Sequence, residues 1–113
     1  MREADSIRLK HMLDAANEIS KFTKEITKGE FKKDRKLHLS IVRLLEIIGE
    51  AAAKIEPDVQ SKYNQIPWKG IIGMRNRLIH GYFDIDLEIV WETVKGDIPN
   101  LISELEKVVQ NLE

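Results

Sequence analysis

Apolar residues recur at intervals of three and four along most of the chain, the spacing of one face of an α-helix. The pattern predicts a first helix over residues 5–26, ended by Gly29. It predicts a second helix over residues 34–55, with Asp34 as its N-cap. The apolar positions are Leu9, Met12, Leu13, Ala16, Ile19, Thr23 and Ile26 in the first helix, and Leu37, Ile41, Leu44, Ile48, Ala51 and Ile55 in the second.

The second half of the chain predicts two more main helices. Pro57 should start a short helical turn, and Pro67 suits the first position of a third helix that ends at Gly81. Asp86 is the expected N-cap of the last helix, which Pro99 should kink. The apolar face of that helix is Leu87, Val90, Trp91, Val94, Ile98, Leu101, Leu105, Val108 and Leu112.

No stretch alternates as a strand would, so we predict an all-α fold. The expected architecture is an antiparallel bundle of four main helices in a single domain, residues 1–113. Gly49 lies inside the second predicted helix, and alanines follow at 51–53. These small side chains leave room for another backbone to approach this side of the helix closely. Trp68 and Trp91 sit in apolar contexts and are expected to anchor the core or an interface.

Composition narrows the class of protein. The chain has 18 basic and 19 acidic residues, a net charge of −1 and no cysteine. This charge argues against nucleic-acid binding by bulk electrostatics. The run at 28–36 has five basic and two acidic residues, a net charge of +3, and is either solvated surface or a contact for RNA or a partner. Without cysteines or an apolar run of roughly 20 residues, the expected location is cytoplasmic, with no membrane partner.

The stretch GMRNRLIHGYF, residues 73–83, concentrates the polar chemistry of the chain. Arginine offers a fixed charged fork for phosphate, and histidine can give or take a proton near neutral pH. Asn76 and His80 are one turn apart, whereas Arg75 lies about 140° from His80 on a regular helix. The cluster could therefore cap a helix end, bind a partner or cleave RNA, which requires only a base for the 2′-OH and a cation for the developing charge.

Metal and cofactor sites are not expected. Asp84, Asp86 and Glu88 could suggest a cation site, but a helix N-cap explains their positions better. His11 and His38 lie far apart in the sequence, on different predicted helices.

Arg75–Tyr82 resembles the R-x4-H-x-Y motif of the HepT family, a branch of the HEPN domains. The resemblance extends to LLEIIGEAAAKI (44–55), IPWKGIIGMRN (66–76) and FDIDLEIVWETVKGDIPNLISELEKV (83–108), so it covers most of the chain in order. It implies an all-helical homodimer that acts as a metal-independent endoribonuclease, the toxin of a type VII toxin–antitoxin pair.

The resemblance also assigns roles to single residues. It implies that Arg75 and His80 form the active site, with Asn76 as the polar residue after the arginine. An MntA-type minimal nucleotidyltransferase, the antitoxin, would transfer AMP to Tyr82 and so block RNA cleavage. Lys69 and Arg77 are further candidate RNA contacts. The alternative is a non-catalytic subunit that binds nucleotide or substrate for the nucleotidyltransferase.

Overall fold

The computed structural model describes residues 1–81 and 84–112, and within these ranges every regular element is helical. The four longest helices are α1 (Glu3–Thr23), α3 (Arg35–Lys54), α5 (Trp68–His80) and α7 (Ile98–Gln110). The shorter elements are α2 (Lys28–Lys33), α4 (Pro57–Lys62), α6 (Leu87–Glu92) and the π-helical segment η1 (Thr93–Asp97). The all-α prediction is confirmed.

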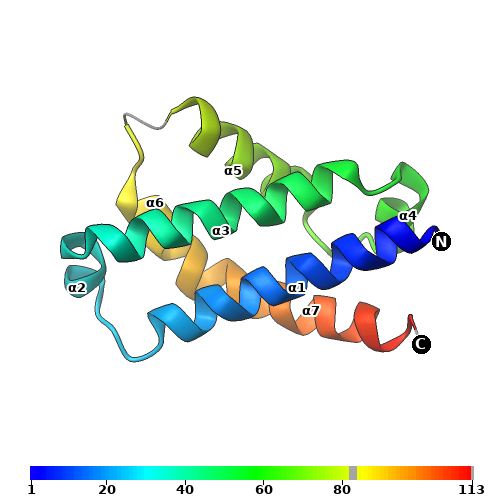
Figure 1. Cartoon of the computed structure of the whole chain (residues 1–113), viewed down its shortest axis with the longest axis horizontal. Coiled ribbons are helices and arrows are strands. Elements are labelled where there is room, and N and C mark those ends of the chain that lie inside the picture. The colour runs from blue at the N-terminus through cyan, green and yellow to red at the C-terminus, as the bar shows by residue number, and fades with distance from the viewer. Residues whose placement is uncertain (82–83, 113) are drawn as a thin grey trace.

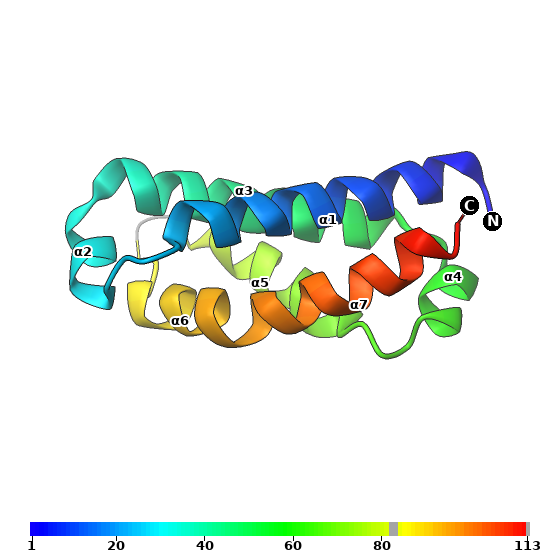
Figure 2. The same cartoon turned by 90° about the horizontal axis from the view of Figure 1, so that it is seen from below.

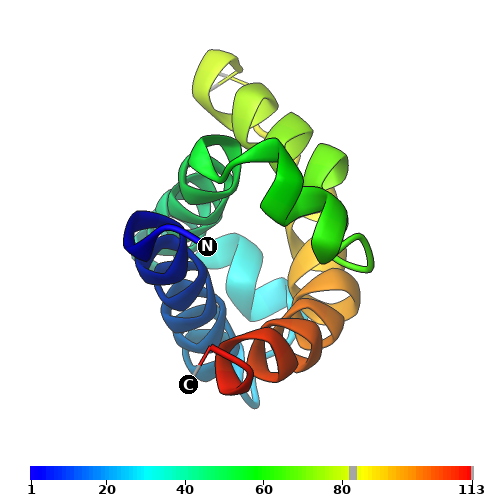
Figure 3. The same ribbon diagram turned by 90° about the vertical axis from the view of Figure 1, so that its right-hand side faces the viewer.

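The long helices pack in the spatial order α7, α1, α3, α5 (Figure 1). α1 lies against both α3 and α7, while α5 lies on the far side of α3. Figure 2 shows that both termini lie at one end of the molecule, opposite α2. Viewed along the long axis, the helices surround a shared interior (Figure 3). No helix in the described ranges is long and apolar enough to cross a membrane.

The predicted apolar faces meet in this interior. Leu9, Met12, Ile41 and Leu105 are fully buried. Trp68 is 8% exposed, and its indole Nε1–H donates to backbone oxygens before α5. The half-buried Trp91 packs on Phe31, with ring centroids 5.1 Å apart. Both tryptophans are thus core anchors, as predicted.

The prediction that the first helix continues to residue 26 and ends at Gly29 is wrong. α1 ends at Thr23, and Gly29 lies inside α2. A capping box starts this extra helix: the Glu30 N–H donates to Thr27 Oγ1, and the Thr27 N–H donates to Glu30 Oε1. Because these bonds satisfy amides that a helix start leaves free, they favour a new helix over extension of α1.

The N-caps of the later helices follow the prediction. The Asp34 carboxylate accepts from the Leu37 N–H at 3.0 Å. The Asp86 carboxylate accepts from the Glu88 and Ile89 N–H groups. Pro67 differs by one position, because it is the N-cap residue of α5 and Trp68 is the first helical residue.

The irregularity predicted at Pro99 lies just before it. The irregular turn is η1, which ends at Asp97, and Pro99 is the second residue of α7. The proline ring would clash with the carbonyl four residues earlier in a regular helix. The wider π turn moves the hydrogen bonds out of that register, so that the Ile98 N–H donates to Thr93 O.

Candidate active site

α5 carries the polar cluster and has a well-defined end. Gly81 is its C-cap, and the Gly81 N–H donates to Arg77 O at 2.8 Å. A Cβ at Gly81 would lie 2.9 Å from that oxygen, so a side chain there would crowd the last turn. The prediction that Gly81 ends the helix is confirmed. Tyr82 lies outside the described residues.

Arg75 and Asn76 are joined directly. Arg75 Nη1 donates to Asn76 Oδ1 at 2.9 Å, and the Arg75 side chain is half-buried. Arg75 Nε is buried and has no hydrogen-bond partner among residues 1–81 and 84–112. Asn76 Oδ1 thus holds the guanidinium through one Nη atom, and the planar charged fork of an arginine is suited to binding an anion.

His80 is the last residue of α5 and is exposed. His80 follows Arg75 by five positions, which corresponds to about 140° around the helix and about 7.5 Å along it. In the described part of the chain, no hydrogen bond joins His80 to Arg75 or Asn76. The structure therefore brings Arg75 and Asn76 together and leaves the imidazole free at the end of the same helix.

The two further RNA-contact candidates lie on different faces of α5. Lys69 precedes Asn76 by seven residues and His80 by eleven, so all three follow one stripe of a regular helix. Arg77 is about 200° from Arg75 and borders a groove on the other side of α5. Lys69 thus shares the stripe of Asn76 and His80, while Arg77 does not.

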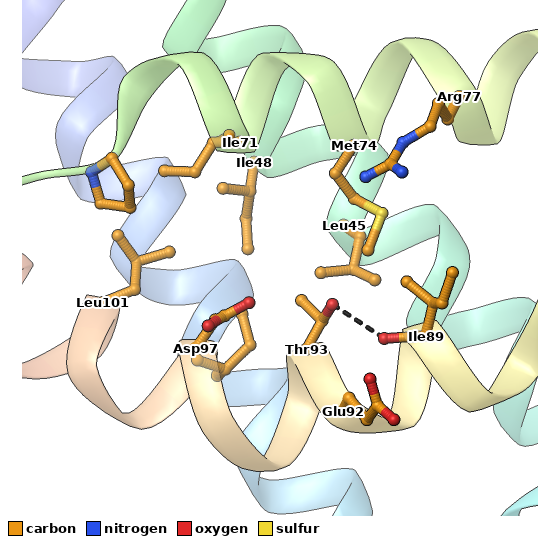
Figure 4. A pocket seen from close by; sticks show the side chains of 13 residues that line it. Leu45, Ile48, Ile71, Met74, Arg77, Ile89, Glu92, Thr93, Asp97 and Leu101 are labelled. Atoms are coloured by element: carbon orange, nitrogen blue, oxygen red, sulfur yellow. Dashed lines mark hydrogen bonds between the residues drawn. The ribbon is translucent and has the colours of Figure 1, made fainter.

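That groove has a volume of about 500 Å³ and separates α5 from α6, η1 and α7 (Figure 4). Leu45 and Ile48 of α3 and Ile71 and Met74 of α5 are among its apolar lining residues. Arg77, Glu92 and Asp97 supply charges around it. The apolar periodicity gave no sign of the groove, because residues that line a groove and residues that fill a core share the same spacing.

The basic run at 28–36 is partly neutralised by α6. Glu88 accepts from Lys28 at 3.1 Å and from Lys32 at 2.6 Å. Hydrogen bonds from Lys32 and then Lys28 lower the pKa of the Glu88 carboxyl. This pairing ties α2 to α6 and leaves the rest of the run to solvent or a partner.

Asp84 and Asp86 precede α6, and Glu88 lies in its first turn. The Asp86 carboxylate is engaged as the N-cap of α6, which supports the capping interpretation. Among the residues that the structure describes, no three His, Asp or Glu side chains are placed to hold a metal ion.

Fold and cluster together define an all-α domain with a candidate site for phosphate binding and acid–base chemistry. The family model for ribonuclease HepT-like proteins matches residues 12–108. The chain belongs to the HepT-like ribonuclease family, within the HEPN superfamily.

Two relatives are similar over most of their length. A protein of Thermococcus cleftensis named "probable ribonuclease HepT" is 39% identical over 108 residues, which cover 96% of this chain and 98% of that protein. A protein of Methanocaldococcus jannaschii named "putative RNase" is 41% identical over 102 residues, covering 90% and 84% of the two chains. No solved structure gives a significant match.

Proposed function

We propose that this protein is an endoribonuclease that cleaves RNA without a metal ion, using Arg75, Asn76 and His80. The observation that carries the proposal is the Arg75–Asn76 hydrogen bond on a helix that ends in an exposed histidine. Membership of a ribonuclease family supports the choice of RNA as substrate. The proposed location is the cytoplasm, where RNA and ATP are both present.

The proposed reaction is an attack of the ribose 2′-oxygen on the adjacent phosphorus. His80 takes the 2′-OH proton, the new P–O bond forms, and the bond to the 5′-oxygen breaks. The 5′-oxygen then takes a proton from water, and protonated His80 returns its proton to solvent, which leaves a 2′,3′-cyclic phosphate and a 5′-hydroxyl. Arg75 stabilises the extra negative charge on the phosphate oxygens, and Asn76 orients the guanidinium.

The proposed active form is a homodimer, which is supported by the different directions of Arg75 and His80 and by exposed apolar residues on α5 and α3. Arg75 and His80 point about 140° apart on one helix, so a second copy could complete the set of groups around one phosphate. Ile79 lies on the Arg75 side of α5, one turn after Arg75, and is 36% exposed. On α3, the exposed Leu39 lies on the stripe of Arg43, Glu46 and Glu50.

We further propose that a nucleotidyltransferase antitoxin inactivates the enzyme at Tyr82. The phenol oxygen would attack the α-phosphorus of ATP, with release of pyrophosphate and loss of the phenolic proton. The attached AMP would place a phosphate and a base near α5, where the phosphate could pair with Arg75 and exclude RNA. In the sequence, Tyr82 directly follows Gly81, the C-cap residue of α5.

Expression of the isolated chain in cells tests the toxin assignment. Wild type should arrest growth, and His80→Ala should relieve the arrest at equal protein level. Incubation with the cognate nucleotidyltransferase and ATP should raise the intact mass by whole AMP units in wild type and not in Tyr82→Phe. Harmless wild type, or the same mass increase in Tyr82→Phe, would contradict the respective assignment.

The groove beside α5 favours a second candidate, a non-catalytic subunit that binds nucleotide or substrate for the nucleotidyltransferase. This candidate predicts that expression of wild type and of His80→Ala is equally harmless. It also predicts that Met74→Trp, which fills the groove, weakens binding of the partner, while His80→Ala does not.

A further inference from the structure

We propose that Gly49 is a positioning residue for Arg75. The absence of a side chain at this point of α3 lets α5 lie so close that the Arg75 stem is pressed against the α3 backbone. The catalytic consequence rests on the function proposed above, whereas the packing itself does not.

The contact is too close for any other residue at position 49. A Cβ built on Gly49 would lie 2.1 Å from Arg75 Cβ and 2.7 Å from Arg75 Cγ. It would also lie 3.3 Å from the backbone oxygen of Ile71. Carbon atoms in contact are normally about 3.5–4.0 Å apart. Because Arg75 Cβ is fixed to the α5 backbone, the clash cannot be relieved by a side-chain rotation, and α5 itself would have to move.

Other helical glycines show that this requirement is local. A Cβ at Gly70, Gly73 or Gly96 would meet nothing within 4 Å. Glycine is a poor helix former, so alanine would favour the helix at each of those positions. At Gly49 the glycine lowers the stability of α3 as a helix, but it allows α5 to approach closely.

The close approach of α5 to α3 determines which guanidinium atoms of Arg75 are available to bind phosphate. Gly49 itself is buried, the Arg75 Cβ and Cγ atoms lie against it, and Arg75 Nε is buried as well. Nη1 is held by Asn76 Oδ1 at 2.9 Å. The aliphatic part of Arg75 is packed against Gly49 and Nη1 is held by Asn76, so the guanidinium has little conformational freedom. Such preorganisation is needed to stabilise a charge that develops during the reaction.

The kinetic test compares Gly49→Ala with Gly96→Ala, which adds the same methyl group in open space on η1. Gly49→Ala should lower kcat for RNA cleavage about 100-fold, because misplacing a catalytic group by about 1 Å can cost that much. Its KM should change much less, and it should retain a cooperative thermal transition. Gly96→Ala should match wild type. Wild-type kcat in Gly49→Ala, or loss of its folding transition, would overturn the proposal.

A second measurement does not depend on activity. The Arg75 Nε–H signal in ¹⁵N NMR spectra, assigned by its loss in Arg75→Lys, should exchange slowly with water in wild type and in Gly96→Ala. It should exchange fast in Gly49→Ala, because α5 moves away from α3. Equal exchange in all three proteins would contradict the positioning role. If wild type cleaves no RNA, the proposed function fails, and this comparison still decides whether Gly49 positions Arg75.

Discussion

At the scale of single residues, Asn76 has a defined partner. Helical spacing had placed Asn76 on the face of His80, but its side chain instead accepts from the neighbouring Arg75. Spacing could not predict this pair, because a long arginine side chain reaches residues outside its own helical stripe. The interaction assigns Asn76 the task of orienting the guanidinium.

Asn76→Ala should therefore impair cleavage less than loss of Arg75 itself. A hydrogen bond to a charged group contributes about 1.5–3 kcal/mol, so kcat/KM should fall about 10- to 100-fold. Unfolding in urea should change little, because Asn76 is exposed. Asn100→Ala on α7 is the matched control, and equal kcat/KM in the two variants would remove Asn76 from the site.

At the scale of elements, helix boundaries are predictable wherever one residue determines them. The Asp34 and Asp86 carboxylates accept from backbone N–H groups at helix starts, and Gly81 ends α5 where a Cβ would crowd Arg77 O. All three predicted positions are confirmed. α2 differs from the prediction because Gly29 lies inside this helix and does not end α1. The Thr27–Glu30 capping box was the sequence signal that would have located the helix start.

The link between α2 and α6 should depend on pH. The pKa of Glu88 is lowered by Lys32 and Lys28, so the carboxylate pairing is complete above the unfolded-state value of about 4.3 and is lost as pH falls through the lower folded-state value. Glu88→Gln should accordingly melt at a slightly lower temperature than wild type at pH 7. The difference should be lost as pH falls through the lowered pKa of the Glu88 carboxyl, and it should shrink in high salt.

The matched control for this link is Glu106→Gln, since Glu106 is exposed on α7 and no ion pair in the described part of the chain involves it. It should melt at the wild-type temperature at both pH values. A Glu88→Gln difference that persists or grows at low pH would show that the ion pairs do not explain it.

At the scale of the whole molecule, α5 has two different sides. One side carries Arg75, Asn76 and Ile79, and the other borders the groove with Met74 and Arg77. The sequence predicted the helix and its motif, but not the groove, because separation of α5 from α7 depends on tertiary packing rather than on the period of either helix. Tyr82 remains a prediction from the resemblance alone.

The dimer proposal concerns the first of these sides. Wild type should sediment as a dimer, and Ile79→Glu should sediment as a monomer, because a buried, unpaired carboxylate strongly opposes association. RNA cleavage should fall in parallel. Ile7→Glu changes a similarly exposed isoleucine on α1 and should remain dimeric. A dimeric Ile79→Glu, or a monomeric wild type, would contradict the assignment of this face.

The central claim is that Arg75 and His80 carry out RNA cleavage. It is tested most directly by the rate at which the purified protein cleaves RNA in the presence of a chelator. Arg75→Ala and His80→Ala should each lower the rate at least about 100-fold, while His11→Ala, on exposed α1 surface, should retain it. Cleavage by His80→Ala at the wild-type rate, or wild-type cleavage abolished by the chelator, would contradict the account.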